Sequence, residues 1–81
     1  MIVTPGSPVN SGYAGTNAPV VQNLGPGDLY VYNSDVNVTT EGLLLPPFAV
    51  YEFPHVVVEG PGAIWFQALG GNCDVRVMNV G

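Results

Sequence analysis

The chain has 81 residues, of which 47% are hydrophobic and only 9% are charged, and its formal net charge at pH 7 is −5. Since ordinary soluble domains carry about 25% charged residues, this composition predicts an unusually apolar surface. Six acidic residues stand against one Arg and no Lys, so the chain lacks the cations that neutralise phosphates, and we expect neither nucleic acid nor membrane partners.

The first 18 residues are rich in Gly, Pro, Ser and Asn and show no apolar period typical of a helix or a strand. We therefore expect an extended N-terminal arm over residues 1–18, followed by a single β domain over residues 19–81. Two interpretations of the arm stay open. It is either a frayed chain end or a segment that becomes ordered by adding to the sheet edge of a partner, with Ile2, Val3 and Tyr13 among the side chains it would bury.

From residue 19 onward the pattern is one of short strands separated by turn residues. Residues 20–24 begin it, and the Gly-Pro-Gly sequence at 25–27 is predicted to break it. Residues 29–32 then read as a strand whose aliphatic side chains share one face while Tyr30 and Tyr32 share the other, because successive side chains point to opposite sides.

The middle of the chain predicts two less regular segments. After a turn at 33–35, residues 36–40 alternate apolar and polar side chains, which favours a half-exposed strand. Residues 43–54 are apolar but contain three prolines. Since proline cannot donate to a sheet ladder, this run is predicted to be an edge strand or a crossing loop. A β-branched run at 55–58 predicts a further strand, closed by a turn at 59–62.

The last part of the chain predicts a hairpin. Residues 63–69 place Ile64, Phe66 and Ala68 on one face and Trp65, Gln67 and Leu69 on the other. The Gly-Gly-Asn sequence at 70–72 fits a short hairpin connection. In the strand that follows, Cys73, Val75 and Val77 are expected to face the core, and Asp74, Arg76 and Met78 to face outward.

No segment offers a helical period over ten or more residues, so the regular alternation of strands and turns predicts an all-β fold. The expected architecture is a small antiparallel sandwich or barrel-like domain with the N-terminal arm extending from it.

A domain of this size buries only about 60% of the surface of its unfolded chain and usually needs help from disulfides, a metal or oligomerisation. Cys73 is the only cysteine and His55 the only histidine, so the sequence predicts neither an internal disulfide nor a zinc site. Self-association, or docking on a larger assembly, is the remaining source of stability.

The sequence predicts no catalytic site and no cofactor. The six acidic residues are scattered singly, and Cys73 is expected to be a small buried hydrophobe because its predicted side chain points away from Arg76. Neither Gly-Pro-Gly sequence, at 25–27 or at 60–62, is followed by the Lys and Ser or Thr of a phosphate-binding loop. We therefore expect a protein that binds or assembles and is not an enzyme.

A charge-depleted surface with many aromatic residues suits contact with another protein, although a soluble monomer with some exposed valines is the alternative. Two roles stay open for Trp65: it packs in a second core on the other face of its strand, or it anchors an interface with a partner. Arg76 is expected either to pair with an acidic residue of its own chain or to form a contact across an interface. The residues predicted to form the assembly interface are Ile2, Val3, Tyr13, Tyr30, Tyr32, Phe48, Tyr51, Trp65 and Arg76.

A family resemblance rests on turn and strand sequences in the second and last parts of the chain. They are the Asn-Leu-Gly-Pro-Gly-Asp-Leu-Tyr-Val sequence at 23–31, Ser-Asp-Val at 34–36, Thr39, Gly42, Leu44 and Pro46, and the closing segment at 68–77. The chain resembles the small β-sandwich accessory proteins of tailed bacteriophage virions over about three quarters of its length. The prolines at 46, 47 and 54 depart from the Gly-rich strand entry that is usual in that family.

The resemblance implies a non-enzymatic virion structural protein, most simply a capsid decoration or cement protein. Its partners would be further copies of itself, in a trimer or other small ring, and the major capsid protein or another virion protein. It would be made in the host cytoplasm, since no targeting signal is visible, and would lie on the capsid surface of the virion. The alternatives are a tail, neck or fibre-attachment component, or a small carbohydrate-binding module that uses Trp65 and the tyrosines as a sugar platform.

Overall fold

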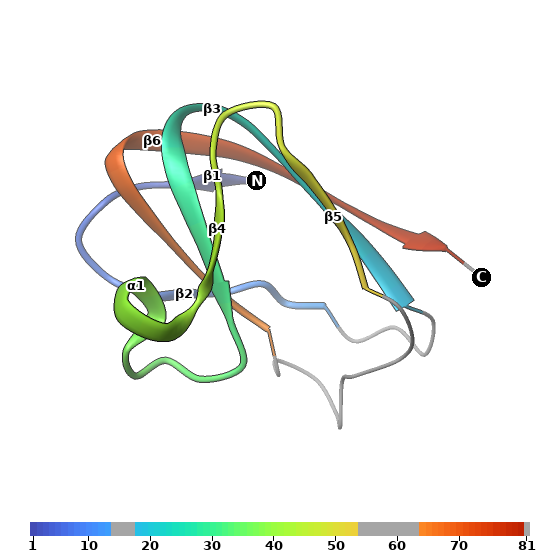
Figure 1. The fold of residues 1–81 in the computed structure, drawn as a ribbon, viewed down its shortest axis with the longest axis horizontal. Helices are drawn as coiled ribbons and strands as arrows, with labels where there is room; N and C mark the ends of the chain where they lie inside the picture. Colours follow the sequence, from blue (N-terminus) through green and yellow to red (C-terminus); the bar gives the residue numbers. More distant parts are fainter. Residues whose placement is uncertain (14–17, 54–63, 81) are drawn as a thin grey trace.

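The computed structural model describes residues 1–13, 18–53 and 64–80 and shows an antiparallel β-sheet with one short helix (Figure 1). The predicted all-β fold is confirmed. The elements are β1 (Ile2–Val3), β2 (Val9–Asn10), β3 (Ala18–Tyr32), α1 (Val38–Glu41), β4 (Leu43–Leu45), β5 (Val50–Glu52) and β6 (Trp65–Val80).

Two long strands, β3 and β6, pair along nearly their whole length, and short strands flank them on both sides. On the outer edge of β6 lie β1 and β2, and on the outer edge of β3 lie β4 and β5. The pairing divides the sheet into two halves. The β5 half contains β5, residues 18–23 of β3, residues 73–80 of β6 and β1, whereas the β4 half contains β4, residues 28–32, residues 65–69 and β2.

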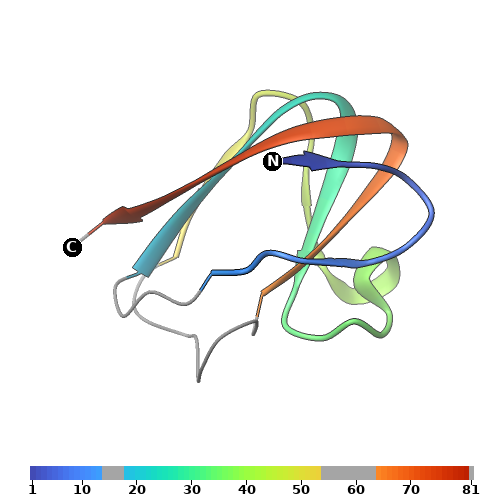
Figure 2. The ribbon, with the colours of Figure 1, turned by 180° about the vertical axis from the view of Figure 1, so that it is seen from behind.

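The two halves meet at a β-bulge. Between paired positions, β3 advances five residues from Asn23 to Asp28 while β6 advances six from Leu69 to Val75 (28 − 23 = 5 and 75 − 69 = 6). Gly70, with a φ of 79°, supplies a left-handed conformation that glycine adopts without steric cost. The extra residue changes which side chains of β6 face inward, so that even-numbered residues are buried before the bulge and odd-numbered residues after it. Both long strands curve at this junction, as the view from behind also shows (Figure 2).

The predicted strand break at 25–27 and the predicted hairpin at 70–72 are wrong, because both segments lie inside long strands. The residues on either side of each glycine segment pair with the other long strand and not with one another. Glycine is required here by close approach. A Cβ atom on Gly27 would overlap the carbonyl oxygen of Gly71, so the crossing of the two strands depends on the missing side chain.

One hydrophobic core lies on the inner face of both halves. The expected inward orientation of Cys73 and Val75 is confirmed, since both are buried. The side chains predicted to share a face with Leu29 and with Phe66 are buried together as well. Burying one such side chain contributes about 1.5–3 kcal/mol relative to leaving it exposed. The core consists of Val3, Tyr13, Val21, Leu29, Val31, Leu45, Ile64, Phe66, Ala68, Cys73 and Val75.

The expectation that residues 1–18 contain no strand is wrong for β1 and β2. Both pair with β6, and the backbone N–H of Val75 donates to the carbonyl oxygen of Met1 at 2.8 Å. Because these hydrogen bonds depend on a distant sheet edge, local composition did not reveal them. The N-terminal segment thus adds to a sheet edge of its own chain, and addition to a partner stays a prediction.

The predicted strand at 36–40 is also wrong, since residues 38–41 form the helix α1. The edge of β3 that this segment would need is occupied by β4, and Asn37 takes a left-handed conformation that turns the chain into the helix. The prediction of an edge strand within 43–54 is confirmed by β4 and β5. The strand and turn predicted at 55–62, with His55, lie outside the described residues.

Candidate interaction surface

Every second side chain of the long strands points away from the core, so each half of the sheet has an outer face. The two outer faces differ in chemistry. We call the outer face of the β4 half, with Tyr30, Tyr32 and Trp65, the aromatic face. We call the outer face of the β5 half, with Val20, Val50 and Met78, the aliphatic face.

The aromatic face is assembled from three strands. Tyr32 lies opposite Trp65 across the β3–β6 ladder, and Tyr30 lies opposite Leu44 across the β3–β4 ladder. Directly opposed side chains on one face of an antiparallel pair are in contact range, so Tyr32 lies within reach of Trp65, and Tyr30 lies within reach of Leu44. Tyr30, Tyr32 and Trp65 are half-buried, whereas Leu44 is exposed.

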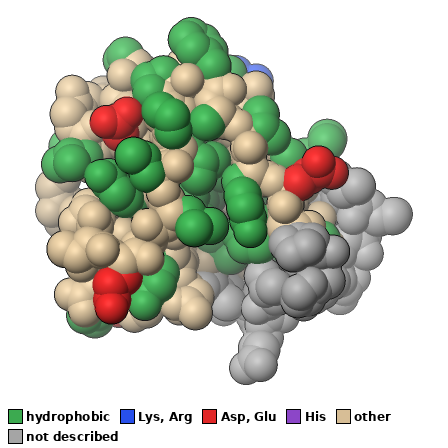
Figure 3. Space-filling model, viewed as in Figure 1, with side chains coloured by type: hydrophobic (Ala, Val, Ile, Leu, Met, Phe, Trp, Pro, Cys, Tyr) green, Lys and Arg blue, Asp and Glu red, His purple; other side chains and the backbone are tan. Residues whose placement is uncertain are grey.

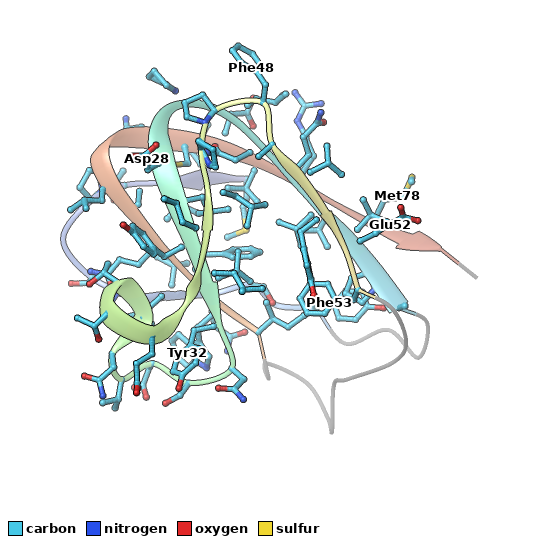
Figure 4. All side chains as sticks on the ribbon, viewed as in Figure 1. Asp28, Tyr32, Phe48, Glu52, Phe53 and Met78 are labelled. Atoms are coloured by element: carbon cyan, nitrogen blue, oxygen red, sulfur yellow. The ribbon has the colours of Figure 1, made fainter. Side chains whose placement is uncertain are left out.

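A hydrogen bond positions one of these rings. The hydroxyl of Tyr32 donates to Oε2 of Glu41 in α1 at 3.3 Å. The negative charge of Glu41 raises the pKa of Tyr32, and partial burial and the hydrogen bond act in the same direction. The phenol therefore remains a neutral hydrogen-bond donor at neutral pH, and Figure 4 shows it beside the helix.

The aliphatic face is built around Val20. This residue pairs with Met78 on one side and with Glu52 on the other, and Gln22 pairs in the same way with Arg76 and Val50. The side chains of Met78 and Val50 are 61% and 55% exposed. Figure 4 shows Met78 and Glu52 at this end of the sheet, away from the aromatic face.

An open hollow of about 270 Å³ lies on the aliphatic face. Aliphatic side chains dominate its lining, and Arg76 and Gln22 are its polar members. The residues that line it are Val20, Gln22, Val50, Arg76, Val77 and Met78.

Arg76 is the only Lys or Arg of the sequence, and its guanidinium lies 3.3 Å from the carboxylate of Asp74, two residues away on the same strand. Local pairing, one of the two predicted roles of Arg76, is therefore present. Both side chains are exposed to solvent to a large degree, and exposed pairs of this kind contribute about 0–1 kcal/mol. Crossing an interface, the other predicted role, stays a prediction.

Phe48 lies in the turn between β4 and β5 and is 75% exposed, with a φ of 72°. A bulky residue in this left-handed region costs about 1–2 kcal/mol. The surrounding hydrogen bonds hold it there. The N–H of Phe48 donates to the carbonyl oxygen of Asn23 at 2.6 Å, and the N–H of Ala49 donates to Pro46 at 3.0 Å. Figure 4 shows the ring projecting outward from the turn.

Asn23 connects this turn to the bulge. Its fully buried side-chain amide donates to the carbonyl oxygens of Gly27 and Leu45 at 2.9 and 2.8 Å, and its side-chain oxygen accepts from the N–H of Gly25 at 2.8 Å. Because both ends of the amide are satisfied, the residue fixes β3, β4 and the turn relative to one another. Its role was not predicted, although the Asn-x-Gly-x-Gly pattern contained the signal.

The structure brings together only part of the predicted interface. Tyr30, Tyr32 and Trp65 share the aromatic face. Val3 and Tyr13 are buried in the core of the same chain. Tyr51 packs partly against the core, with its ring 4.8 Å from that of Phe53 in an edge-to-face arrangement.

The remaining predicted residues lie elsewhere on the surface. Ile2 is exposed beside Asp74 at the β1 edge, and Phe48 and Arg76 lie at the turn and at the hollow. Sequence analysis did not include Met78 or Val50 among the interface residues. The outward position of Met78 was predicted from strand alternation. The direction of the Val50 side chain was not predicted, because the prolines at 46, 47 and 54 interrupt the strand pattern around it.

Apolar side chains spread across the view that carries β4 and β5, with separated acidic side chains among them (Figure 3). Among residues 1–13, 18–53 and 64–80, no three His, Cys, Asp or Glu side chains gather into a group that would hold a metal ion. In the same residues, no helix has the length and hydropathy needed to cross a membrane.

Cys73 is buried, and its thiol donates to the carbonyl oxygen of Asp28 at 3.2 Å. Burial raises the pKa of the Cys73 thiol, and the charge of Asp28 raises it further. Because the thiolate is the reactive form, this environment suppresses nucleophilic chemistry. Cys73 therefore acts as a packing residue.

Comparison with protein-family models finds no match. Comparisons with curated proteins and with solved structures likewise find no significant similarity.

Proposed function

We propose that this chain is a non-enzymatic structural protein that associates with copies of itself and docks on a larger protein shell. The observation that carries the proposal is the exposure of large apolar side chains on both outer faces and on the turn between β4 and β5. Contiguous exposed apolar surface in a soluble protein usually marks a site of interaction.

Charge supports the choice of a protein partner. The chain has one Lys or Arg and a net charge of −5, which disfavours phosphate-bearing partners. The centres of protein interfaces are depleted of charged residues and enriched in aromatic residues and Met. Trp65, the tyrosines of the aromatic face and Met78 fit that composition.

The two outer faces support two kinds of contact. In the proposal, the aliphatic face serves self-association, since it holds the hollow and the only Lys or Arg. The aromatic face docks on the shell, with Trp65 as its anchor, because Trp and Tyr are the residues most often found at interface hot spots.

The resemblance to accessory proteins of tailed-phage virions is the reason why we propose a phage capsid as the shell. In the proposal, the chain is a capsid decoration protein that binds the major capsid protein from the outside of the particle. Many copies on one closed shell would hold through multivalency even where each contact is weak. A tail, neck or fibre-attachment component would use the same surfaces and would differ by its location in the particle.

Light scattering across a dilution series tests self-association, and co-sedimentation with shells of the major capsid protein of the same virus tests docking. We expect a mass that is a fixed multiple of the 8.5 kDa chain over the series, together with saturable binding to shells. A monomer at every concentration would contradict self-association. Protein that stays in the supernatant with shells at every concentration would contradict docking.

A second candidate function, sugar binding, is favoured by the position of Tyr30, Tyr32 and Trp65 on one outward face. Flat aromatic side chains stack on sugar rings through their apolar faces. Trp65 is the only Trp of the sequence, so its fluorescence during a titration with oligosaccharides reports on this face directly. A saturable change would favour sugar binding, and an unchanged spectrum would leave the protein shell as the partner of this face.

A further inference from the structure

One edge of β6 continues past the strand that covers it. β1 lies along this edge as far as Val75, whose N–H donates to the carbonyl oxygen of Met1 at 2.8 Å and whose carbonyl oxygen accepts from the Met1 nitrogen at 2.7 Å. β6 itself continues to Val80, and both ribbon views show it running on beyond β1 (Figure 1, Figure 2). Among the residues that the structure describes, no strand pairs with residues 76–80 on the side away from β3.

The pairing of Val75 also gives the direction of the backbone groups that follow it. Successive residues of a strand direct their N–H and C=O groups to opposite sides of the strand. Val77 and Asn79 therefore present theirs on the same side as Val75, whereas Arg76 and Met78 present theirs to β3. An extended backbone is the partner that matches such a row of donors and acceptors.

This edge has few of the features by which proteins prevent the addition of a further strand. Protected edges commonly carry Lys, Pro or a β-bulge. The sequence at 75–80 is Val-Arg-Val-Met-Asn-Val, and these residues pair with β3 in unbroken register. The one charged residue, Arg76, is held by Asp74. The edge is therefore a regular, charge-poor strand that is open to an extended segment.

We propose that the β6 edges of two copies pair antiparallel about a two-fold axis at Met78 and join the two sheets into one. The inference rests on the self-association in the proposed function and identifies its contact. In this arrangement Val77 of one copy lies opposite Asn79 of the other, and the two residues exchange both of their N–H···O hydrogen bonds. The open backbone groups of both copies are then all paired.

The N-terminal strand decides the register. An axis at Val77 would place Asn79 opposite Val75 of the other copy, whose backbone groups already bind Met1. With the axis at Met78, residues 76–80 of one copy lie opposite residues 80–76 of the other, and β1 stays in place in both. A second copy therefore fits the open part of the edge without displacing any strand of the fold.

The side chains at the axis favour a second copy as the occupant. Met78 is 61% exposed in the single chain. Across the axis it meets Met78 of the other copy in a non-hydrogen-bonded pair, where opposed side chains are closest, so each of the two covers the other. Residues 76–80 are thus their own complement on this face. The pairing also joins the two aliphatic faces into one surface.

The charges near the axis do not oppose this pairing. Arg76 lies opposite residue 80 of the other copy, so the two guanidinium groups do not face one another. Glu52 lies at the level of Met78, but on β5, with β3 between them. The two copies of Glu52 are therefore five strand spacings apart, or about 24 Å. This separation exceeds the screening length of about 10 Å at 0.1 M salt.

The first test measures mass by light scattering over a dilution series. The wild type is expected at twice the 8.5 kDa of the chain or at a larger even multiple. Asn79→Pro removes an edge N–H and no N–H of the ladder with β3, and proline is tolerated at such edge positions. This variant is expected to fold and to self-associate about tenfold more weakly. An odd multiple for the wild type, or unchanged association of the folded variant, would overturn the inference and leave the proposed function standing.

The second test places charges at the axis. Met78→Lys opposes two ammonium groups and Met78→Glu opposes two carboxylates, so each variant alone is expected to be monomeric. An equimolar mixture opposes one ammonium group to one carboxylate and is expected to recover the wild-type mass. Val36→Lys and Val36→Glu are the matched controls, because Val36 is 59% exposed and lies in the bend before α1, and both should keep the wild-type mass. No complex in the mixture would overturn the inference.

Amide hydrogen exchange followed by NMR examines the edge directly. The N–H groups of Val77 and Asn79 are expected to be protected in concentrated wild-type protein and to exchange freely on dilution, while that of Met78 stays protected at both concentrations. Equal exchange at both concentrations in an oligomeric wild type would overturn the inference. Protection that appears only when capsid shells are added would assign the edge to a strand of the shell protein and likewise overturn it. A wild type that is monomeric at every concentration would overturn the inference and the self-association in the proposed function together.

Discussion

The two halves of the sheet have the same strand arrangement on the inside and different chemistry on the outside. In each half a short strand, β3, β6 and another short strand lie side by side, and both halves contribute to one core. The outer face of the β4 half carries half-buried tyrosines and a Trp beside the exposed Leu44, whereas the β5 half exposes aliphatic side chains around a hollow. Packing of the core does not determine the outward side chains, and the proposed function attributes the difference between the two faces to different partners.

The two halves are joined at the bulge, where Gly27 permits the close approach of the long strands and Asn23 forms buried hydrogen bonds. The largest expected effect is that of Gly27→Ala, which should lower the free energy of unfolding by about 3 kcal/mol or more. The added Cβ would overlap the carbonyl oxygen of Gly71, and both glycines lie inside the long strands β3 and β6. Urea unfolding followed by Trp fluorescence measures the loss.

Gly71→Ala is the control for this change. A Cβ on Gly71 would lie 3.4 Å from the Cα of Gly27, which is an ordinary van der Waals contact. We expect a loss below about 1 kcal/mol for this variant. Equal losses for the two variants would contradict the interpretation that Gly27 alone permits the close crossing.

Asn23→Ala breaks the connection between the junction and the turn that carries Phe48. Its removal leaves two carbonyl oxygens and one N–H without their buried partner. We expect a loss of about 2–3 kcal/mol in the free energy of unfolding. Asn33→Ala, in an exposed bend, should change it by less than about 0.5 kcal/mol, and a similar loss in both variants would argue against the role of Asn23.

Trp65→Ser sharpens the contrast between the faces. In the proposed function, this variant should bind shells about tenfold more weakly, because an anchor residue is lost, while its mass in solution stays that of the wild type. Co-sedimentation and light scattering measure the two quantities. If the variant instead unfolds with a stability loss as large as that of a core Phe→Ala change, about 3–5 kcal/mol, Trp65 belongs to a two-sided core.

A smaller change in the free energy of unfolding is expected at alkaline pH. It comes from the buried thiol of Cys73, which lies next to the bulge. Burial raises the pKa of Cys73 above its ordinary value of about 9, so the unfolded chain loses this proton at lower pH than the folded chain. The stabilisation is present in full below pH 9 and is lost as the pH rises toward the folded-state pKa. One such proton limits the slope to about 1.4 kcal/mol per pH unit.

Urea unfolding between pH 8 and pH 10 measures this slope, and Cys73→Ala provides the comparison. The variant should lose less stability than the wild type over that range. Parallel pH profiles for the two proteins would assign the alkaline loss to other groups, such as Tyr32, whose pKa Glu41 also raises.

The smallest effect concerns salt. Raising the salt concentration from about 0.05 to 0.5 M should strengthen self-association a few-fold, because it screens the repulsion between chains of net charge −5. Light scattering at fixed protein concentration measures the change. Weaker association at high salt would instead indicate that Arg76 crosses the interface to pair with an acid of the neighbouring copy.

Strand alternation predicted much of the core and of the candidate surface. Cys73 and Val75 were expected inside and Met78 outside, and Leu29 was expected on the face opposite to Tyr30 and Tyr32, because side-chain direction in a strand follows from local backbone geometry. The glycine segments were misinterpreted for a complementary reason. Gly and Pro mark a hairpin only when the flanking strands pair with each other, and the residues that flank these two glycine segments pair with a distant strand instead.

The sequence by itself determined the all-β class, the acidic and charge-poor surface, and the face on which most strand residues lie. Only the tertiary structure decided that the N-terminal strands pair with β6, that residues 38–41 turn into a helix, and that Phe48 and the hollow are exposed on one chain. The physical reason is that composition and alternation act over a few neighbouring residues. Strand pairing, by contrast, depends on which distant sheet edge is available to receive the backbone hydrogen bonds.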